Sequence, residues 1–493
     1  MDLDPNRILT DIWLNIRLLP WHWFAPATHL FLAISAAIHA MLYKRDSRAA
    51  LGWITICLFI PFIGPLFYYM FGINRIQTQA RKLASLHQFR LRVGYERGTR
   101  RGKVITTVDA HTLPLQRFVQ ISDHVASRPL VAGNTVDILQ NGEQAYPEML
   151  AAINNASSRV FLVSYLFESD AVGEAIVEAL ISAHRRGVEV RVIVDGIGEL
   201  YSWPRVSRVL HRAGVPVARF LPPKLLPPTI SINLRNHRKI LVVDSDHGFT
   251  GGMNIGVRHL AESMSDKATT DVHFHLRGAV VGQLEDVFIE DWRFVTGEEL
   301  AASELTAKSS GKIYCRCITD GPNEDLDKIS LVLMGAISAA RHEIFIVTPY
   351  FLPSREMIAS LQSAALRGVT VTIILPQNSN LPFVDWATRN LLWELLLHGV
   401  RVYYQPPPFS HAKLFIVDGI YAQIGSANMD PRSLRLNFEL NMEVIGSECV
   451  DRLVEYSRYR HSRSSEITLQ EIDQRGLLTR LRDATCWLFS PYL

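Results

Sequence analysis

The sequence is poor in cysteine and has almost no excess of one charge sign. Its five cysteines, in 493 residues, form no CxxC pair and no Cys/His ligand run, which argues against a disulfide framework and a zinc ribbon. Lys and Arg number 51 and Asp and Glu 48, so the difference is 51 − 48 = +3 and gives no argument for nucleic-acid binding. Charged residues make up only 20% and hydrophobic residues 48%, so we expect part of the chain to lie in a membrane.

Two long stretches near the N-terminus contain no Lys, Arg, Asp or Glu. The first, residues 24–43, has 20 residues and would span about 30 Å as a helix, one bilayer thickness. The second, residues 49–72, contains Pro61 and Pro65, which we expect to kink it. We predict a two-helix transmembrane hairpin in a segment, residues 1–73, that begins with an interfacial helix. The alternatives are a signal peptide followed by a core helix, and a buried soluble hairpin.

Residues 74–130 are predicted to form a basic juxtamembrane linker. Between positions 75 and 103 there are nine basic residues and a single acid, Glu96. By the positive-inside rule this excess places the rest of the chain on the cytoplasmic side, and it would attract an anionic membrane surface. The alternative is an ordinary solvated linker.

The remaining chain repeats one pattern of strand, helix and strand. Residues 160–163 and 190–194 flank a helix in the first copy, and residues 344–347 and 369–375 flank one in the second. Strands that alternate with helices of this length indicate an α/β fold with largely parallel strands. Two copies with so long a period indicate duplicated domains, which we place at residues 131–305 and 306–493.

Both copies end in the same polar pattern, HxKxxxxD followed by GxxN. The two histidines lie 174 residues apart (411 − 237 = 174), and the internal spacing is identical. The residues of the pattern are His237, Lys239, Asp244 and Asn254 in the first copy, and His411, Lys413, Asp418, Ser426 and Asn428 in the second. A lone histidine beside a strand is usually structural, but two copies inside a repeat make coincidence improbable.

These residue types suit phosphodiester chemistry. His237 and Lys239 share one face of a strand because they are two positions apart, and the same holds for His411 and Lys413. If the two halves meet, one neutral imidazole attacks phosphorus while the other, protonated, donates to the leaving oxygen. The lysines and asparagines stabilise charge on the non-bridging oxygens, which metal ions do elsewhere, so we expect no metal and no cofactor.

Carboxylates complete the candidate set. Asp271 and Glu439 follow the two motifs, and we expect each to hold the second nitrogen of the histidine in its own half, unless it is an ordinary surface acid. Asp244 and Asp418 are also candidates. We rank them below the histidines and lysines because they follow a buried strand and are suited to bind backbone amides.

The motifs resemble those of the phospholipase D superfamily, and most closely those of bacterial cardiolipin synthases. The resemblance runs through nearly all of residues 130–493, with supporting stretches at 236–239, 291–294, 296–298, 348–351, 410–413 and 426–433. It implies a pseudo-dimer of two phospholipase D-like domains, a phosphohistidine intermediate and no required metal. It also implies transfer of a phosphatidyl group between two phosphatidylglycerol molecules in a bacterial inner membrane, giving cardiolipin and glycerol.

One position departs from symmetry, because Gly252 stands where the second motif has Ser426, so a hydroxyl contact to phosphate is expected only in the second half. The sequence leaves open which histidine is the nucleophile, and we favour His237, with His411 as general acid and base. It also leaves open a hydrolytic phospholipase D, a transferase using another alcohol, a nuclease and an inactive membrane scaffold. We expect no nucleic-acid partner, and an oligomer is compatible with the sequence.

Overall fold

The computed structural model describes residues 21–44, 47–72, 113–223, 234–263, 268–303, 311–321 and 327–490. The chain forms two compact units, Met1–Leu83 and Ala84–Leu493. The predicted interfacial helix before residue 21, the basic stretch at 75–103 and the predicted domain boundary at 305 lie outside the described residues.

The first unit is built on one long apolar helix, α2 (Trp21–Tyr43). Over Trp23–Tyr43 this helix has the length and the apolar composition needed to cross a membrane. Small residues, Ala33, Ala36 and Ala40, are buried and allow close packing with α3 (Ser47–Phe59). Larger apolar side chains of the unit, such as Phe31, remain exposed, as expected for a surface that faces lipid.

The second predicted span, residues 49–72, is not one continuous helix. Its first part, α3, has 13 residues and therefore a length of about 20 Å, less than a bilayer core. The helix stops before Pro61, and a left-handed residue, Phe62 (φ 59°), precedes α4 (Ile63–Phe67) and one π-helical turn, Tyr68–Gly72. The predicted kink at Pro61 is therefore present, but among the described residues of this unit only α2 reaches the length of a membrane span.

The second unit contains one 15-stranded sheet, counted over the described residues. From the middle of the sheet outward, the strands of the first half follow the order β1, β8, β6, β5, β2, β3, β4. Their bounds are β1 Val131–Gln140, β2 Arg159–Ser164, β3 Glu189–Asp195, β4 Val217–Phe220, β5 Ile240–Val243, β6 His247–Gly251 and β8 Val272–Arg277.

The second half repeats this order on the other side of the middle, as β9, β16, β15, β14, β10, β11, β12, with β17 at the edge. The halves join where β1 pairs antiparallel with β9. The bounds are β9 Ile313–Asp320, β10 Glu343–Val347, β11 Thr370–Pro376, β12 Arg401–Gln405, β14 Leu414–Val417, β15 Tyr421–Gly425, β16 Glu439–Ile445 and β17 Ser465–Glu466. This mirrored order confirms the predicted α/β duplication, but the prediction of largely parallel strands is wrong. Only β2, β3, β4 and β10, β11, β12 run parallel within each half, and the other ten pairings described in this sheet are antiparallel.

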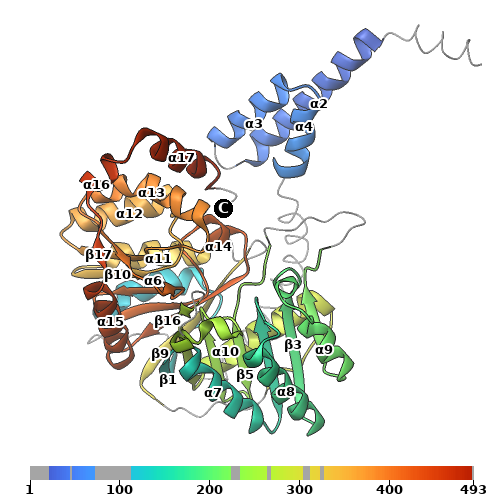
Figure 1. The fold of residues 1–493 in the computed structure, drawn as a ribbon, viewed down its shortest axis with the longest axis vertical. Coiled ribbons are helices and arrows are strands. Elements are labelled where there is room, and N and C mark those ends of the chain that lie inside the picture. Colours follow the sequence, from blue (N-terminus) through green and yellow to red (C-terminus); the bar gives the residue numbers. More distant parts are fainter. Residues whose placement is uncertain are drawn as a thin grey trace, which may run out of the picture. The chain divides into compact units, whose positions relative to one another are not determined.

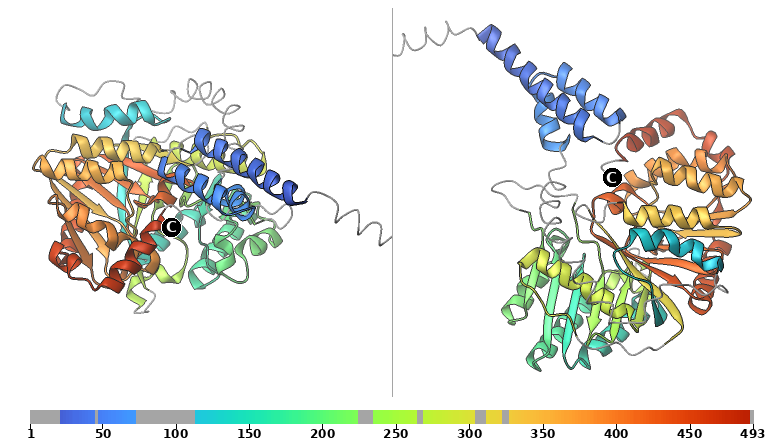
Figure 2. Two further views of the ribbon diagram at one scale, coloured as in Figure 1. Left: turned by 90° about the horizontal axis from the view of Figure 1, so that it is seen from above. Right: turned by 180° about the vertical axis from the view of Figure 1, so that it is seen from behind.

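Helices cover both faces of the sheet (Figures 1 and 2). In the first half α7 (Asn141–Asn154), α8 (Ala171–Arg185) and α9 (Val206–Arg212) share one core, and α10 (Val280–Thr296) packs on the other face. The second half uses α11 (Lys328–Ala339), α12 (Arg355–Leu366) and α13 (Pro382–Leu396), with α15 (Ser447–Ser462) opposite. The second half also contains two five-residue helices, α14 (Pro431–Arg435) and α16 (Leu469–Asp473), and the 12-residue helix α17 (Leu477–Leu488).

Residues 113–125, which we predicted as linker, form helix α6 (Leu113–Val125) of the second unit. Phe118 of α6 is buried and stacks on Tyr421 of β15, with ring centroids 5.2 Å apart. The linker prediction fails here because the apolar positions of this amphipathic segment face α11 and join the core of the second half.

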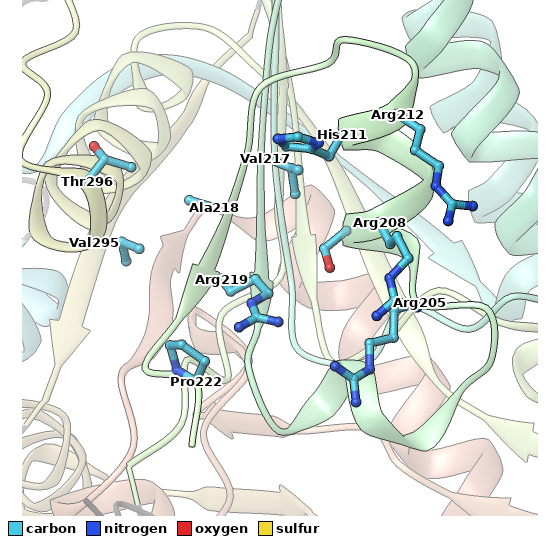
Figure 3. A pocket seen from close by; sticks show the side chains of 11 residues that line it. Arg205, Arg208, His211, Arg212, Val217, Ala218, Arg219, Pro222, Val295 and Thr296 are labelled. Carbon is cyan, nitrogen blue, oxygen red and sulfur yellow. The ribbon is translucent and has the colours of Figure 1, made fainter. Parts of the chain in front are cut away.

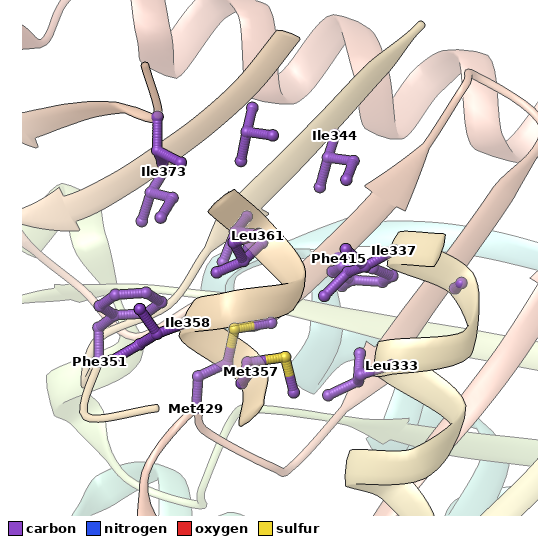
Figure 4. Packing of buried hydrophobic residues seen from close by; sticks show 14 of the residues in the cluster. Leu333, Ile337, Ile344, Phe351, Met357, Ile358, Leu361, Ile373, Phe415 and Met429 are labelled. Atoms are coloured by element: carbon purple, nitrogen blue, oxygen red, sulfur yellow. The ribbon is translucent and has the colours of Figure 1, made fainter. Parts of the chain in front are cut away.

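The core of the second half supports the segment that leads into the site. Leu333 and Ile337 of α11 and Leu361 of α12 pack with Ile344 of β10 (Figure 4). The segment after β10 is tied to the second GxxN turn by the bridge between Phe351 and Met429. Its counterpart in the first half is the bridge between Phe167 and Ile255, so both halves place the end of one strand against their GxxN turn.

Candidate active site

Each HxK segment runs beside the chain of the other half. Asn236 forms a parallel bridge with Phe438, and the backbone N–H of His237 donates to the carbonyl of Phe438 (2.9 Å). In the other direction β13 (Phe409–Ser410) pairs in parallel with β7 (Thr269–Thr270), and the N–H of His411 donates to Thr270 (2.8 Å). The two histidines therefore enter the same interface between the halves.

Each histidine is held by the carboxylate of the opposite half. Nδ1 of His237 lies 3.1 Å from Oε1 of Glu439, and Nδ1 of His411 lies 2.9 Å from Oδ2 of Asp271. This corrects our prediction that each carboxylate serves the histidine of its own half. The cause is the pairing just described, because Glu439 follows the Phe438 that binds His237, and Asp271 follows the Thr270 that binds His411.

Both imidazoles are enclosed but reachable. Their side chains are 12% and 11% exposed, for His237 and His411, while both carboxylates are fully buried. With Nδ1 occupied by a carboxylate, Nε2 is the nitrogen left for a ligand. The paired arrangement is therefore suited to two imidazoles acting on one phosphorus.

The two lysines adopt the same conformation in both halves. Nζ of Lys239 donates to the carbonyl of His237, and Nζ of Lys413 donates to the carbonyl of His411. Both donor–acceptor distances are 2.6 Å. An ammonium has three donors, so each lysine keeps donors for phosphate oxygens. Burial lowers the pKa of Lys239 to about 7 and that of Lys413 to about 8, against the opposing effect of Glu439 and Asp271 respectively.

Burial also lowers the pKa of both histidines. For His237 the negative charge of Glu439 opposes this effect and Lys239 adds to it. The pKa of His411 lies well below its ordinary value because of burial and because Lys413, Lys239 and His237 add positive charge around it. The positive charges of the two motifs thus act on each other, as expected for groups that share one site.

Asp244 and Asp418 lie at the far ends of strands β5 and β14, away from the histidines, and bind backbone. Asp244 accepts from the amides of Ser157 (2.8 Å), Ser158 (2.8 Å) and Arg159 (3.0 Å). Burial acts to raise the pKa of Asp244, but these hydrogen bonds outweigh it and lower the pKa to about 2.

Asp418 makes the equivalent contacts, accepting from the amides of Arg341 (2.9 Å), His342 (2.7 Å) and Glu343 (3.1 Å). Both aspartates have φ 52°, so the turn geometry is also the same. The structure therefore corrects their inclusion among the catalytic candidates, since each anchors the start of a neighbouring strand.

Gly252 and Ser426 differ because the two carboxylates differ in length. A Cβ at Gly252 would lie 2.7 Å and 2.9 Å from the two carboxylate oxygens of Asp271, so the site has no room for a side chain there. At the equivalent place Ser426 donates to Oε2 of Glu439 and accepts from the amide of Leu440 (3.0 Å). The predicted contact of this hydroxyl with phosphate is therefore replaced by support of a carboxylate.

The asparagines of the GxxN turns are buried beside the site. Oδ1 of Asn254 accepts from the amide of Leu166 (3.3 Å), and Nδ2 of Asn428 donates to Ser433 (3.0 Å). In the described part of the chain Oδ1 of Asn428 has no hydrogen-bond partner. Within the same residues no group of three or more His, Cys, Asp or Glu side chains is arranged to hold a metal ion.

The sequence reasoning missed two tyrosines that flank the imidazoles. Tyr165 meets His237 edge to face, with ring centroids 5.0 Å apart, and Tyr350 meets His411 in the same way at 6.4 Å. Nζ of Lys239 lies 5.6 Å from the centre of the Tyr165 ring. Each tyrosine lies shortly after an equivalent strand, β2 or β10, but Tyr165 is two residues before Phe167 and Tyr350 is one residue before the equivalent Phe351. A comparison of the two halves therefore does not align them.

Two arginines at equivalent positions were missed as well, each 21 residues after its histidine (258 − 237 = 432 − 411 = 21). Arg258 forms an ion pair with Glu168. Arg432 is half-buried and influences the pKa of Tyr165 and Tyr350, but its guanidinium forms no ion pair with any residue that the structure describes. Arg432 is therefore suited to bind an anionic oxygen at the site.

Comparison with known families gives one consistent result. A family model described as "Cardiolipin synthase, PLD-like domain" matches residues 149–292 and 333–459. A second, described as "Phospholipase D-nuclease N-terminal", matches residues 31–72.

Curated relatives match over nearly the whole chain. A cardiolipin synthase of Alkalihalophilus pseudofirmus is 32% identical over 458 residues, covering 91% of this chain and 90% of the relative. The major cardiolipin synthase of Bacillus subtilis is 30% identical over 463 residues, covering 91% and 95%. Among solved structures, a phosphatidylserine synthase of Haemophilus influenzae covers 76% of this chain and 100% of its own, with a TM-score of 0.59 and 14% identity, a likeness of fold alone.

Proposed function

The chain belongs to the cardiolipin synthase family with phospholipase D-like domains, and on this premise we propose that it transfers a phosphatidyl group from one phosphatidylglycerol to another. The products are cardiolipin and glycerol. The observation that carries the proposal is the pair of imidazoles, His237 and His411, each held at Nδ1 by a carboxylate of the other half.

In the first step Nε2 of one histidine attacks the phosphorus of phosphatidylglycerol, and the bond from phosphorus to the headgroup glycerol oxygen breaks. The other histidine gives its proton to that oxygen, so glycerol leaves neutral and a nitrogen–phosphorus bond remains. Lys239, Lys413, Asn254 and Asn428 are suited to stabilise the charge on the non-bridging oxygens during this step.

In the second step a hydroxyl of another phosphatidylglycerol loses its proton to the histidine that acted as acid. The resulting oxygen attacks phosphorus, the nitrogen–phosphorus bond breaks and cardiolipin forms. Water in place of that hydroxyl would give phosphatidic acid, so the outcome depends on which acceptor reaches the site.

We assign the nucleophile to His237 and the acid and base role to His411. The pKa of His411 is low in the free site, and the negative charge of a bound phosphodiester raises it, so that His411 can hold the proton that the first step needs. Although burial acts to raise the pKa of Glu439, the charges of His237 and Lys239 and a hydrogen bond from Ser426 lower it, so this carboxylate is ionised. An ionised partner stabilises the positive charge of a phosphorylated imidazole. Burial raises the pKa of Asp271, the partner of His411, which makes it the weaker acceptor.

The N-terminal unit is proposed to anchor the enzyme in the bacterial inner membrane. The length and composition of α2 support one span, and the match of residues 31–72 to an N-terminal family model supports a membrane role for the whole segment. We propose that α3 and α4 complete a two-helix, multi-pass hairpin, with the catalytic unit on the cytoplasmic side.

The proposal is tested by incubating the purified full chain with phosphatidylglycerol vesicles and identifying the lipids by mass spectrometry. We expect cardiolipin and free glycerol in equal amounts, and no product from His237→Ala. Phosphatidic acid alone would instead indicate a hydrolytic phospholipase D. A product that appears only with serine or ethanolamine would indicate a related phosphatidyltransferase.

A phosphatidyl ester of p-nitrophenol tests the assignment of the histidines, because this leaving group needs no acid. We expect His411→Ala to release a burst of p-nitrophenol equal to the enzyme concentration and then stall. His237→Ala should give no burst, and the reverse result would exchange the two roles.

A further inference from the structure

An open cavity lined by arginines lies in the first half of the second unit, outside the site described above (Figure 3). It has a volume of about 730 Å³ and is bordered by α9, β4 and the end of α10. No lining residue is acidic, and five are arginine or histidine. These five are Arg205, Arg208, His211, Arg212 and Arg219.

Most of this positive charge is not neutralised by protein. Arg219 pairs with Glu199 at 3.3 Å, but Arg205, Arg208 and Arg212 form no ion pair with any residue that the structure describes. Like charges held together repel one another, and a bound anion removes that cost. Arginine also binds phosphate oxygens in a bidentate way, so the cavity has the chemistry of a phosphate site.

Exposed apolar side chains stand next to the arginines. The loop from β3 to α9 presents Leu200, Tyr201 and Trp203, and Trp203 is 71% exposed. The guanidinium of Arg208 lies 5.4 Å from the centre of the Trp203 ring. Exposed aromatic residues beside basic ones are typical of surfaces that sit at a membrane interface.

The same loop is fixed to the catalytic histidine segment. Asp195 accepts from the amides of Ile197 and Gly198, both at 2.9 Å, and from the amide of Asn236 at 3.1 Å, directly before His237. Burial raises the pKa of Tyr165, and the nearby Asp195 and Tyr201 add to this effect. The exposed loop is therefore next to the entrance of the site.

The second half carries an equivalent apolar loop between β11 and α13. Leu381 of this loop and Phe383, in the first turn of α13, are exposed, Phe383 by 61%. Asn380 of this loop accepts from the hydroxyl of Tyr350 (2.7 Å), the tyrosine beside His411. Exposed apolar side chains thus border the site from both halves, whereas the arginine cavity belongs to the first half.

We propose that the arginine cavity binds the phosphate of an anionic phospholipid in the bilayer surface, while the two apolar loops enter the interface around the site. This docking surface rests on the proposed function, since it brings the entrance of the site to the level of the lipid headgroups. It would hold one anionic lipid next to the half that carries His237.

The test is hydrogen exchange of the full chain in nanodiscs of phosphatidylcholine, with and without phosphatidylglycerol. We expect phosphatidylglycerol to slow exchange in residues 198–220, and high salt to reverse this slowing. Replacing Arg205, Arg208 and Arg212 together by Gln should weaken this lipid binding about a hundredfold and remove the protection. A matched control replaces three exposed arginines outside the cavity, Arg185, Arg355 and Arg452, by Gln and should keep it.

Equal exchange in both kinds of nanodisc, or protection that survives in the cavity variant, would overturn the proposal. Inorganic phosphate or an oligonucleotide that protects the segment in phosphatidylcholine nanodiscs as well as phosphatidylglycerol does would also overturn it. Exchange is measured without turnover, so failure to make cardiolipin in the product assay is a separate result from failure to bind anionic lipid here.

Discussion

Glu439 of the second half lies 3.1 Å from Nδ1 of His237 in the first half. Asp271 and His411 show the same relationship in the opposite direction, at 2.9 Å. Each half therefore contributes a histidine to one pair and a carboxylate to the other, and the two pairs are chemically distinguishable by mutation.

Replacing the two carboxylates separately should affect different steps. With the p-nitrophenol ester, Glu439→Gln should slow the burst about 10²- to 10⁴-fold, because His237 loses the acceptor that orients it. Asp271→Asn should leave a fast burst and slow the later turnover, because His411 then fails to activate the acceptor alcohol. Stopped-flow absorbance measures both phases. Once His237→Ala has been shown to abolish the burst, a slow burst in Asp271→Asn with a normal one in Glu439→Gln would contradict the crossed pairing.

Making the two motifs identical should harm the enzyme. Gly252→Ser places a Cβ where it meets Asp271 at 2.7 Å, so the carboxylate must leave His411. We expect cardiolipin formation to fall by at least about 10²-fold, while Ser426→Gly, which removes one hydrogen bond to Glu439, should cost less. Equal loss in both variants would argue against this explanation of the asymmetry.

Asp244→Asn should lower stability and leave the chemistry largely intact. The carboxylate accepts from three backbone amides, and its loss should cost about 1–3 kcal/mol of unfolding free energy. Against the opposing effect of burial, hydrogen bonds from these amides lower the pKa of Asp244 from its ordinary value of 3.8 to about 2, so its contribution is present above about pH 4 and lost as the pH falls through about 2. Thermal unfolding in detergent at pH 7 measures the loss, and a thousandfold fall in kcat at unchanged stability would contradict the structural role.

The alkaline limb of the pH profile should depend on Lys239. Its pKa is about 7, so the ammonium is charged below that pH and kcat/KM should fall as the pH rises through about 7 to 8. Lys239→Arg stays charged throughout, so the residual activity of that variant should persist to higher pH. An alkaline limb at the same pH in both proteins would assign it to another group.

Arg432 should matter more for substrate binding than Arg258. Arg258 is already paired with Glu168, whereas Arg432 has no ion-pair partner among the described residues. We expect Arg432→Gln to raise KM for phosphatidylglycerol about tenfold or more, and Arg258→Gln to have a smaller effect. Initial rates against the surface fraction of phosphatidylglycerol give this comparison, and equal effects would contradict it.

The sequence predicted those parts of the site that depend on local spacing. The repeat, the duplication of the α/β halves and the expectation that His237, Lys239, His411 and Lys413 share one site all follow from identical motifs on equivalent strands. It did not predict which carboxylate serves which histidine, because that depends on the pairing of Asn236 with Phe438, which lie 202 residues apart (438 − 236 = 202).

The roles of the remaining residues depend on contacts that spacing alone does not determine. Asp244 and Lys239 belong to the same motif and are equally prominent in the sequence. The four-residue strand β5 separates them, so Asp244 lies at the end of this strand that is away from the histidines. Similarly, the charge-free stretch 49–72 suggested one long helix, whereas Pro61 and the left-handed Phe62 divide it.

The crossed pairing also constrains the ancestry of the chain. A polypeptide with a single motif would carry one imidazole together with the acid that serves the imidazole of a sister molecule. Such an ancestor could complete its chemistry only as a symmetric homodimer, so gene fusion would have preserved an existing two-fold assembly. After fusion, a change near the carboxylate of one half alters the imidazole of the other half. The two copies then diverge in compensating pairs, as Gly252 with Asp271 and Ser426 with Glu439 illustrate.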